Sequence, residues 1–425
     1  MHYNATPDSP VQDQPVIGII GMGEMGKMYA RILSSAGWAN TTGTPGINVL
    51  RDGHGVSRTA DWIMYAVEAQ FMDKVVAEYG PSTKVGAVVG GQTSVKTPER
   101  DAFEKYLPED VHIVSCHSLH GPTVSPEGQP LIIIRHRGPD WAQQLVENIL
   151  GPFKSHLVYL SYEEHDLVTA NTQAVTHAAF LSMGTAWHCS ESYPWEQGLY
   201  VRGIEIVKVN IMLRIYSNQW HVYAGLAILN PAARDMIKQY STSTTELFKL
   251  MIAGNQSGLR ERVYKAREAL FGPHRRVTPI LLSEGVLDKF GMPHKEEEYQ
   301  GSGNNSHLSL LAMVDCWATL DIDPFAHLSL AATPLFRLWI GVAEYLFRSE
   351  ERLDAAIHAA VHNVTHRSDD LEFVVAARGW SQCVTFKSFE LYKDRFQHTR
   401  AFFEPRFGEA TALGSKMIKT ILQGE

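Results

Sequence analysis

The chain has 425 residues, of which 44% are hydrophobic and 20% charged, so it can bury a large core and divide into two or three domains. Its net charge of −8 argues against a general binder of nucleic acid or membrane surfaces and favours small-molecule partners. The four cysteines are scattered without a C-x-x-C pair, as is typical of a reducing compartment. Since we find neither a signal-peptide core nor an apolar run of membrane length, we expect a cytoplasmic protein.

A glycine-rich turn follows the first predicted strand. Residues 16–20 form an apolar β-branched run, and a G-x-G-x-x-G motif then leads into a stretch of helical period. This order of strand, turn and helix is typical of dinucleotide binding, because the glycines let a pyrophosphate approach the helix N-terminus. A glycine turn of an ordinary α/β fold is the alternative. The expected cofactor contacts lie in this turn and at the end of the next predicted strand: Gly21, Met22, Gly23, Met25, Gly26 and Val67.

Apolar runs separated by helical patterns predict the rest of this domain. The strands are expected at 62–67, 84–89, 111–116, 131–136 and 157–160, and helices at 70–79 and 141–150. Several runs are continuously apolar, which indicates a mostly parallel, buried sheet. The sequence therefore predicts a Rossmann-like α/β dinucleotide-binding domain over residues 16–160, after a flexible tail at 1–15.

The region after the first helix departs from that fold. A dinucleotide fold carries a second strand here, ending in the residue that recognises the adenosine ribose, but residues 38–46 are polar and turn-forming. A short strand is expected at 47–50. If it is the second strand, Arg51, Asp52 or Arg58 could recognise the ribose, and if it is the third, the recognising residue is missing.

The pattern becomes helical at Ser161. Ser161 and Glu164 have capping-box spacing, and helical periodicity continues to about residue 239 without strand alternation. A polar, glycine- and asparagine-rich stretch at 291–307 precedes further apolar helices. We therefore expect an all-α substrate and dimerisation domain at 161–290 and a C-terminal helical extension at 291–425.

Two polar loops follow neighbouring strands of the predicted sheet. Ser94 lies in G-G-Q-T-S-V-K and His117 in C-H-S-L-H-G-P. Because ligands bind at the carboxyl ends of such strands, a hydroxyl could hold one imidazole nitrogen while the other acts as a base. A histidine that only satisfies loop backbone groups is the alternative. His117 and His120 have no further ligand at metal spacing, so we expect no metal.

The helical domain carries a third polar cluster. Gln173 and His177 are four residues apart on one helix face, and Arg214 lies in an otherwise apolar helix, where it needs an anion. Snorkelling or a structural ion pair is the alternative for Arg214. His165, beside Asp166, is interpreted as surface decoration.

The motifs G-M-G-E-M-G, G-G-Q-T-S-V-K, C-H-S-L-H-G-P, E-E-H-D and T-Q-A-V-T-H, in this order, resemble prephenate dehydrogenase of the fungal type. The resemblance implies a homodimer whose helical domain is similar to that of 6-phosphogluconate dehydrogenase. It also implies NADP-dependent oxidative decarboxylation of prephenate to 4-hydroxyphenylpyruvate in tyrosine biosynthesis, with NAD left open as the cofactor.

The same resemblance implies roles for the polar residues. His117 matches the catalytic histidine that accepts a hydrogen bond from the ring hydroxyl of the substrate, and Ser94 matches the serine that orients it. His177 matches a substrate-side histidine and Arg214 the arginine that binds a prephenate carboxylate, with Gln173 on the same side.

Two other functions stay open at this point. Arogenate dehydrogenase differs only in the amine that replaces the ketone of prephenate. A catalytically impaired relative is favoured by the missing second strand, which the resemblance places before 47–50, and opposed by the four intact polar residues. The same feature predicts a weak preference between NADP and NAD.

Overall fold

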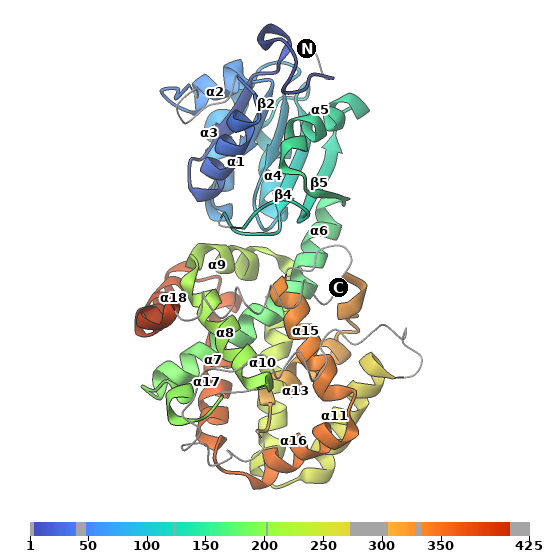
Figure 1. Ribbon diagram of the computed structural model, residues 1–425, viewed down its shortest axis with the longest axis vertical. Coiled ribbons are helices and arrows are strands. Elements are labelled where there is room, and N and C mark those ends of the chain that lie inside the picture. Colours follow the sequence, from blue (N-terminus) through green and yellow to red (C-terminus); the bar gives the residue numbers. More distant parts are fainter. Residues whose placement is uncertain are drawn as a thin grey trace. The chain divides into compact units, whose positions relative to one another are not determined.

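The computed structural model describes residues 4–39, 48–122, 124–200, 203–272, 305–327 and 334–408. The chain divides into two compact units, Met1–Thr169 and Ala170–Glu425. The first combines a sheet with helices, and the described part of the second is helical (Figure 1). This is the predicted fold class, a Rossmann-like domain followed by an all-α domain.

The first unit is built on a six-stranded sheet whose strands lie in chain order. All neighbours run parallel except β4 and β5, which are antiparallel. The strands are β1 (Ile17–Ile20), β2 (Trp62–Tyr65), β3 (Val88–Gly91), β4 (His112–Ser118), β5 (Pro130–Arg137) and β6 (His156–Tyr159). Each strand predicted between 62 and 160 is found with shifted ends. The largest shift is at β3, because a turn with Gly86 at φ +69° occupies the residues expected to begin it.

Helices cover both faces of this sheet (Figure 1). On one face, α1 (Glu24–Ser35) and α5 (Asp140–Leu150) share a core with alternate residues of β1, β2 and β4. On the other lies α4 (Thr97–Tyr106), where the Phe103 ring meets that of Tyr65 at 5.5 Å, and α3 (Met72–Tyr79) packs beside α4. The period of two along each strand therefore gives both faces an apolar layer, as a buried parallel sheet requires.

The segment before β2 differs from expectation. Residues 48–50 lie outside any strand, so this part of the strand predicted at 47–50 is wrong, and residues 40–47 lie outside the described ranges. The reason is local, because Asp52 caps the short helix α2 (Gly53–Thr59) by accepting a hydrogen bond from the Gly55 amide at 3.1 Å. Among the described residues, β1 pairs only with β2 and so forms one edge of the sheet.

The N-terminal residues contact this unit, which differs from the flexible tail expected at 1–15. Ala5 is part of the core, and the Gln14 amide donates to the carbonyl of Pro7 at 3.0 Å. The Gln14 side-chain oxygen accepts from the Ala39 amide at 2.9 Å. Trp38, expected in a polar turn, is buried in the same core, since this clamp holds the end of α1 against residues 5–14.

The second unit is a bundle of helices around one core, and its described residues contain no strand. A π-helix (Ala170–Ala174) leads into α7 (Val175–Cys189). The later helices are α8 (Gly203–Ser217), α9 (Trp220–Leu229), α10 (Pro231–Ile252), α11 (Gln256–Phe271), α13 (Leu308–Thr319), α15 (Pro334–Phe347), α16 (Glu350–His362), α17 (Arg367–Thr385) and α18 (Phe389–Phe403).

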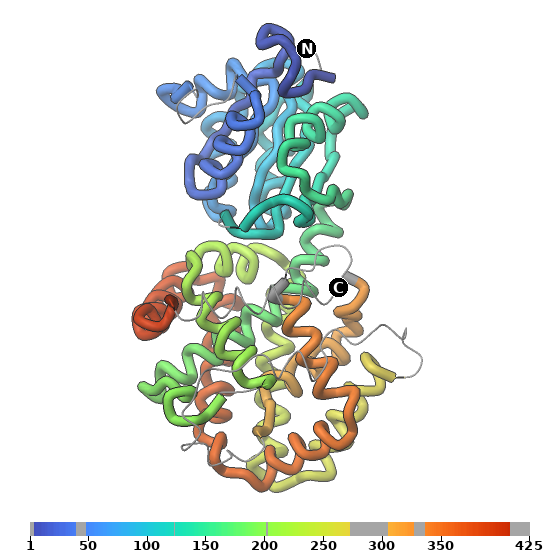
Figure 2. Tube along the Cα trace, viewed as in Figure 1, coloured from blue at the N-terminus to red at the C-terminus, as the bar shows by residue number. Residues whose placement is uncertain are grey.

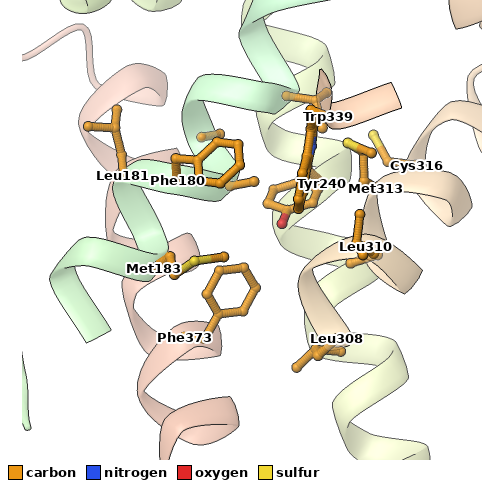
Figure 3. Close-up of a cluster of buried hydrophobic side chains, with 14 of the residues drawn as sticks. Phe180, Leu181, Met183, Tyr240, Leu308, Leu310, Met313, Cys316, Trp339 and Phe373 are labelled. Atoms are coloured by element: carbon orange, nitrogen blue, oxygen red, sulfur yellow. The ribbon is translucent and has the colours of Figure 1, made fainter. Parts of the chain in front are cut away.

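Helices from both ends of this unit share the core. Helix α17 packs along α7, and α18 lies beside α9 although more than 150 residues separate them (Figure 2). Figure 3 shows Phe180 from α7 close to Trp339 from α15, with Phe373 from α17 below them. The residues after 305, expected as an extension, therefore complete the core of α7–α11. No helix among the described residues is long and apolar enough to cross a membrane.

Candidate active site

The glycine turn joins β1 to α1 and has the geometry that a dinucleotide needs. Gly21 has φ +102°, and a Cβ at Gly26 would lie 2.1 Å from the Gly21 carbonyl oxygen, so neither position accepts a side chain. Gly23 faces open space and caps α1 without a side-chain hydrogen bond. The first-turn amides of α1 are thus available to an anion, and the residues present fit a pyrophosphate.

Other predicted cofactor residues also lie near this turn. Val67 follows β2, and its Cγ1 would be 2.9 Å from a Cβ at Gly21, so it borders the turn directly. Met22 is 36% exposed beside Gly23. Met25 is half-buried against the core of this unit.

The candidates for the ribose end lie elsewhere. Helix α2, which separates Arg51 from Arg58, packs by Gly53 against the Tyr79 ring at the end of α3. The Ser57 carbonyl accepts from the Lys84 amide, just before β3. These contacts lie at the amino ends of the strands, whereas the glycine turn is at the carboxyl end of β1. Neither arginine is therefore placed to meet a 2′-phosphate bound at the turn.

A buried ion pair supports the loop after β3. The Lys96 ammonium donates to the carbonyls of Gly91 and Cys116, each at 2.9 Å, and to Glu99, also at 2.9 Å. Both charged side chains are fully buried. Because Gly91 ends β3 and Cys116 lies near the end of β4, Lys96 fixes the two loops that carry the predicted catalytic residues.

Side chains near the end of β4 alternate between the two faces of the sheet. Ser118 lies toward α1, where its hydroxyl is 2.6 Å from the Tyr29 hydroxyl. Tyr29 in turn donates to the Gln92 amide oxygen at 2.9 Å, which links the glycine-turn helix to the loop after β3. His117, one residue before Ser118, lies on the opposite face toward α6 (Tyr162–Thr169).

His117 begins a chain of buried hydrogen bonds. Its Nδ1 is 2.8 Å from Nε2 of His165, and Nδ1 of His165 is 3.0 Å from the Asp166 carboxylate. Asp166 also accepts from the amides of Lys96 and Thr97, at 2.6 and 2.8 Å. His165 is fully buried, so the interpretation of it as surface decoration is wrong. The capping box of Ser161 and Glu164 is confirmed, and it starts α6 so that both residues face inward.

Burial controls the ionisation of this chain. Desolvation, followed by the charges of His165 and Lys96, lowers the pKa of His117 well below its usual range. Desolvation also lowers the pKa of His165. Burial alone would raise the pKa of Asp166, but the hydrogen bonds and charge of His165 and the bonds from Thr97 and Lys96 lower it overall. Two neutral imidazoles and a carboxylate result at neutral pH.

Ser94 does not orient His117 here. It is half-buried in the loop after β3, and within the described residues its hydroxyl makes no hydrogen bond to His117. The ring is held by His165 instead. Nε2 of His117 makes no hydrogen bond within the described ranges, and the residue keeps 6% exposure, so this nitrogen is available to a ligand.

The polar cluster of the second unit gathers around a tyrosine. The Tyr223 ring lies edge-on to His177, 4.7 Å between centroids, and Asn218 donates to its hydroxyl at 3.0 Å. Arg214 is half-buried and has no carboxylate partner among the residues that the structure describes. Desolvation lowers its pKa, followed by an opposing effect of the nearby Tyr223. A half-buried guanidinium of this kind is a candidate anion site.

His177 also lacks a polar partner. Its Nδ1 is buried without a hydrogen bond to any described residue, and burial lowers its pKa to about 3. The side chain lines a small cavity between α7, α9 and α17. Gln173 is half-buried in the π-helix one turn earlier, a type of distortion that often marks functional sites.

Sequence reasoning missed several members of these clusters. Tyr29, Gln92, Glu99 and Tyr223 were not singled out, because a single polar residue in a helix or loop carries no periodic signal. The E-E-H-D motif was noticed, but its histidine and aspartate are adjacent in sequence, and only the turn of α6 shows that both are buried.

Comparisons with known proteins agree with this geometry. A family model described as a 6-phosphogluconate dehydrogenase C-terminal domain matches residues 174–423. The chain is 52% identical over 423 residues to the probable prephenate dehydrogenase [NADP(+)] of Schizosaccharomyces pombe, covering 96% of this chain and 97% of that protein. It is 50% identical over 430 residues to the prephenate dehydrogenase [NADP(+)] of Saccharomyces cerevisiae, with coverage of 96% and 94%. A solved prephenate dehydrogenase from Aquifex aeolicus is 18% identical, with a TM-score of 0.45 over 58% of this chain and 94% of that one.

Proposed function

Since this chain belongs to the prephenate dehydrogenase family, we propose that it oxidises and decarboxylates prephenate to 4-hydroxyphenylpyruvate with NADP, a step of tyrosine biosynthesis. The observation that carries the proposal is His117. Its neutral ring presents one nitrogen without a hydrogen-bond partner among the described residues, at the carboxyl end of β4 in the sheet that carries the glycine turn. A base near a bound dinucleotide suits the oxidation of an alcohol.

The cofactor supplies the acceptor for a hydride when it is bound. The amides of the first turn of α1, next to Gly23, would hold its pyrophosphate, with Gly21 and Gly26 keeping the backbone close. Val67 would border it on the side of β2. Tyr29 and Gln92 link this turn to the loop after β3, so the two parts of the site are held together within one unit.

The substrate chemistry assigns the proton to His117. As hydride leaves the ring carbon that bears the hydroxyl, His117 Nε2 takes the hydroxyl proton and a carbonyl forms. The bond from the ring to its carboxylate then breaks, CO2 leaves, and the electron pair makes the ring aromatic. The resulting phenolate recovers a proton. Aromatisation drives the step, so the side chains need only position the substrate and hold one proton.

The carboxylates of prephenate need cationic or hydrogen-bonding partners. We assign one of them to Arg214, because a guanidinium binds a carboxylate with two parallel hydrogen bonds. His177 and Gln173 lie on the adjoining face and would complete this side of the site. Ser94 is kept as a substrate-side hydroxyl of the loop after β3, in place of the orienting role implied by resemblance.

Absorbance of the reduced nicotinamide tests the activity. Purified protein should reduce NADP when prephenate is added, and the same assay with arogenate separates the two substrates. We expect His117→Asn to lower kcat by roughly 10²–10⁴-fold with a modest change in KM. Histidine His156, exposed on β6, gives the matched control His156→Asn. Near-normal turnover of His117→Asn would remove this residue from the mechanism.

Titration with both cofactors tests the adenosine end. Arg51 and Arg58 lie at the amino ends of the strands, so Arg51→Ala and Arg58→Ala should leave NADP affinity unchanged. The weak preference between NADP and NAD stays a prediction, and tight NADP binding with strong rejection of NAD would contradict it. The homodimer and the cytoplasmic location also stay predictions, and light scattering of the purified chain would measure its mass in solution.

A further inference from the structure

The hydrogen bonds between His117, His165 and Asp166 determine where each proton lies. A backbone amide can only donate, so the amides of Lys96 and Thr97 make Asp166 an acceptor through both oxygens. The Thr97 hydroxyl adds a third bond at 2.6 Å. Asp166 is therefore a carboxylate, and its contact with His165 Nδ1 at 3.0 Å requires that nitrogen to carry the proton.

The remaining assignment follows by elimination along the chain. A neutral imidazole carries one N–H, so Nε2 of His165 must accept. It lies 2.8 Å from Nδ1 of His117, which must then donate. The single proton of neutral His117 is thus on Nδ1, and Nε2 has a lone pair. In water a histidine favours the opposite tautomer, with the proton on Nε2, in which it could not act as a base at this nitrogen.

We propose that His165 and Asp166 are positioning residues that hold His117 in the Nδ1–H tautomer and stabilise the imidazolium formed when Nε2 takes a proton. The inference rests on the proposed function, because it assumes that His117 is the base. Once protonated, His117 still donates to His165, which still donates to the Asp166 carboxylate. The positive charge is therefore paired through two hydrogen bonds inside a region that excludes water.

The position of Asp166 makes this arrangement rigid. Its carboxylate binds the amides at the start of α4, so the acceptor is fixed to the helix that also carries Glu99. His165 is fully buried and Asp166 is 5% exposed, so side-chain rotation is restricted at both positions. Because replacing Asp166 would also remove the α4 contacts, His165 is the better residue to change.

Two substitutions separate positioning from packing. His165→Phe keeps a buried ring but removes the acceptor for His117 Nδ1, and we expect kcat to fall by roughly 10²-fold while KM for prephenate and for NADP changes less than about threefold. In His165→Gln the side-chain amide oxygen can accept the same N–H, so kcat should recover at least about tenfold relative to His165→Phe. The exposed His156 supplies the control His156→Gln, which should match the wild type.

Nitrogen-15 NMR of histidine-labelled protein measures the tautomer without any turnover. The His117 signals are identified by their loss in His117→Asn. We expect a protonated Nδ1 in the wild type and a protonated Nε2 in His165→Phe. A protonated Nε2 in the wild type, or equal kcat in His165→Phe and the wild type, would overturn the inference. If the wild type shows the Nδ1–H tautomer but no prephenate-dependent NADP reduction, the proposed function fails and the tautomer assignment stands.

Discussion

Replacing Lys96 by methionine should strongly destabilise the first unit. The Lys96 ammonium is fully buried and donates to Gly91, Cys116 and Glu99. Methionine fills a similar volume but donates nothing. Glu99 would keep its hydroxyl contact with Thr93 at 2.6 Å, and its charge would lose the only cation that the described residues bring to it.

The structure sets the size of this effect. Removing one partner of a buried ion pair typically costs about 3–5 kcal/mol, because the other charge is left uncompensated. The carbonyls of Gly91 and Cys116 would each lose a donor, at roughly 1 kcal/mol apiece. The expected loss, about 5 kcal/mol, is comparable with the whole stability of a small domain. The double variant Lys96→Met with Glu99→Leu removes both charges and should recover at least half of it.

Hydrogen exchange read by mass spectrometry is the suitable assay, because a chain with two units need not unfold in one step. Peptides covering β3 and β4 should exchange much faster in Lys96→Met. Lys105→Met is the matched control on the same helix, since Lys105 is exposed and 3.7 Å from Asp73. If Lys96→Met stays within about 1 kcal/mol of the wild type, or if the double variant is less stable than the single one, the reasoning about a compensated buried charge is refuted.

Three further variants test other parts of the molecule. Arg214→Ala should weaken prephenate binding by about 2–3 kcal/mol in calorimetry and leave NADP binding unchanged, because a charge-assisted bond to the substrate is lost; an equal loss of NADP affinity would show a structural role instead. Gly23→Ala places a methyl group in open space, so NADP affinity should fall while the melting temperature stays, whereas Gly26→Ala, with its Cβ 2.1 Å from the Gly21 oxygen, should lower both. Burial raises the pKa of Asp370 to about 7, so the folded chain binds more protons than the unfolded one between pH about 4 and 7, and stability from this group falls as the pH rises through that window, by up to about 4 kcal/mol. Asp370→Asn should flatten this slope in urea titrations, and an unchanged slope would mean that the carboxyl titrates normally.

The sequence could predict the features that are written in local patterns. The apolar runs located the strands, the glycine spacing located the turn, and Ser161 with Glu164 located the start of α6. A four-residue run at 47–50 was too short for this, since an apolar tetrapeptide is found equally in strands and in loops that precede a capped helix.

Contacts between distant residues had no such signal. His117 and His165 are 48 residues apart, and their contact depends on the alternation along β4 and on the way in which α6 begins. Tyr223 was invisible for a similar reason, because its contact with His177 joins two helices that are both buried on most sides. Pairings of this kind need the tertiary structure, or a family resemblance that supplies it.

The shared core of the second unit has a consequence for synthesis on the ribosome. Helix α7 ends at Cys189, and its neighbour α17 begins at Arg367, so about 180 residues must be translated before the two can meet. At about 5–20 residues per second this takes roughly 10–40 s, during which the apolar surfaces of α7–α9 wait for their covering helices. The nascent chain should therefore depend on chaperones far more than the first unit does, whose sheet is built from neighbours in the chain.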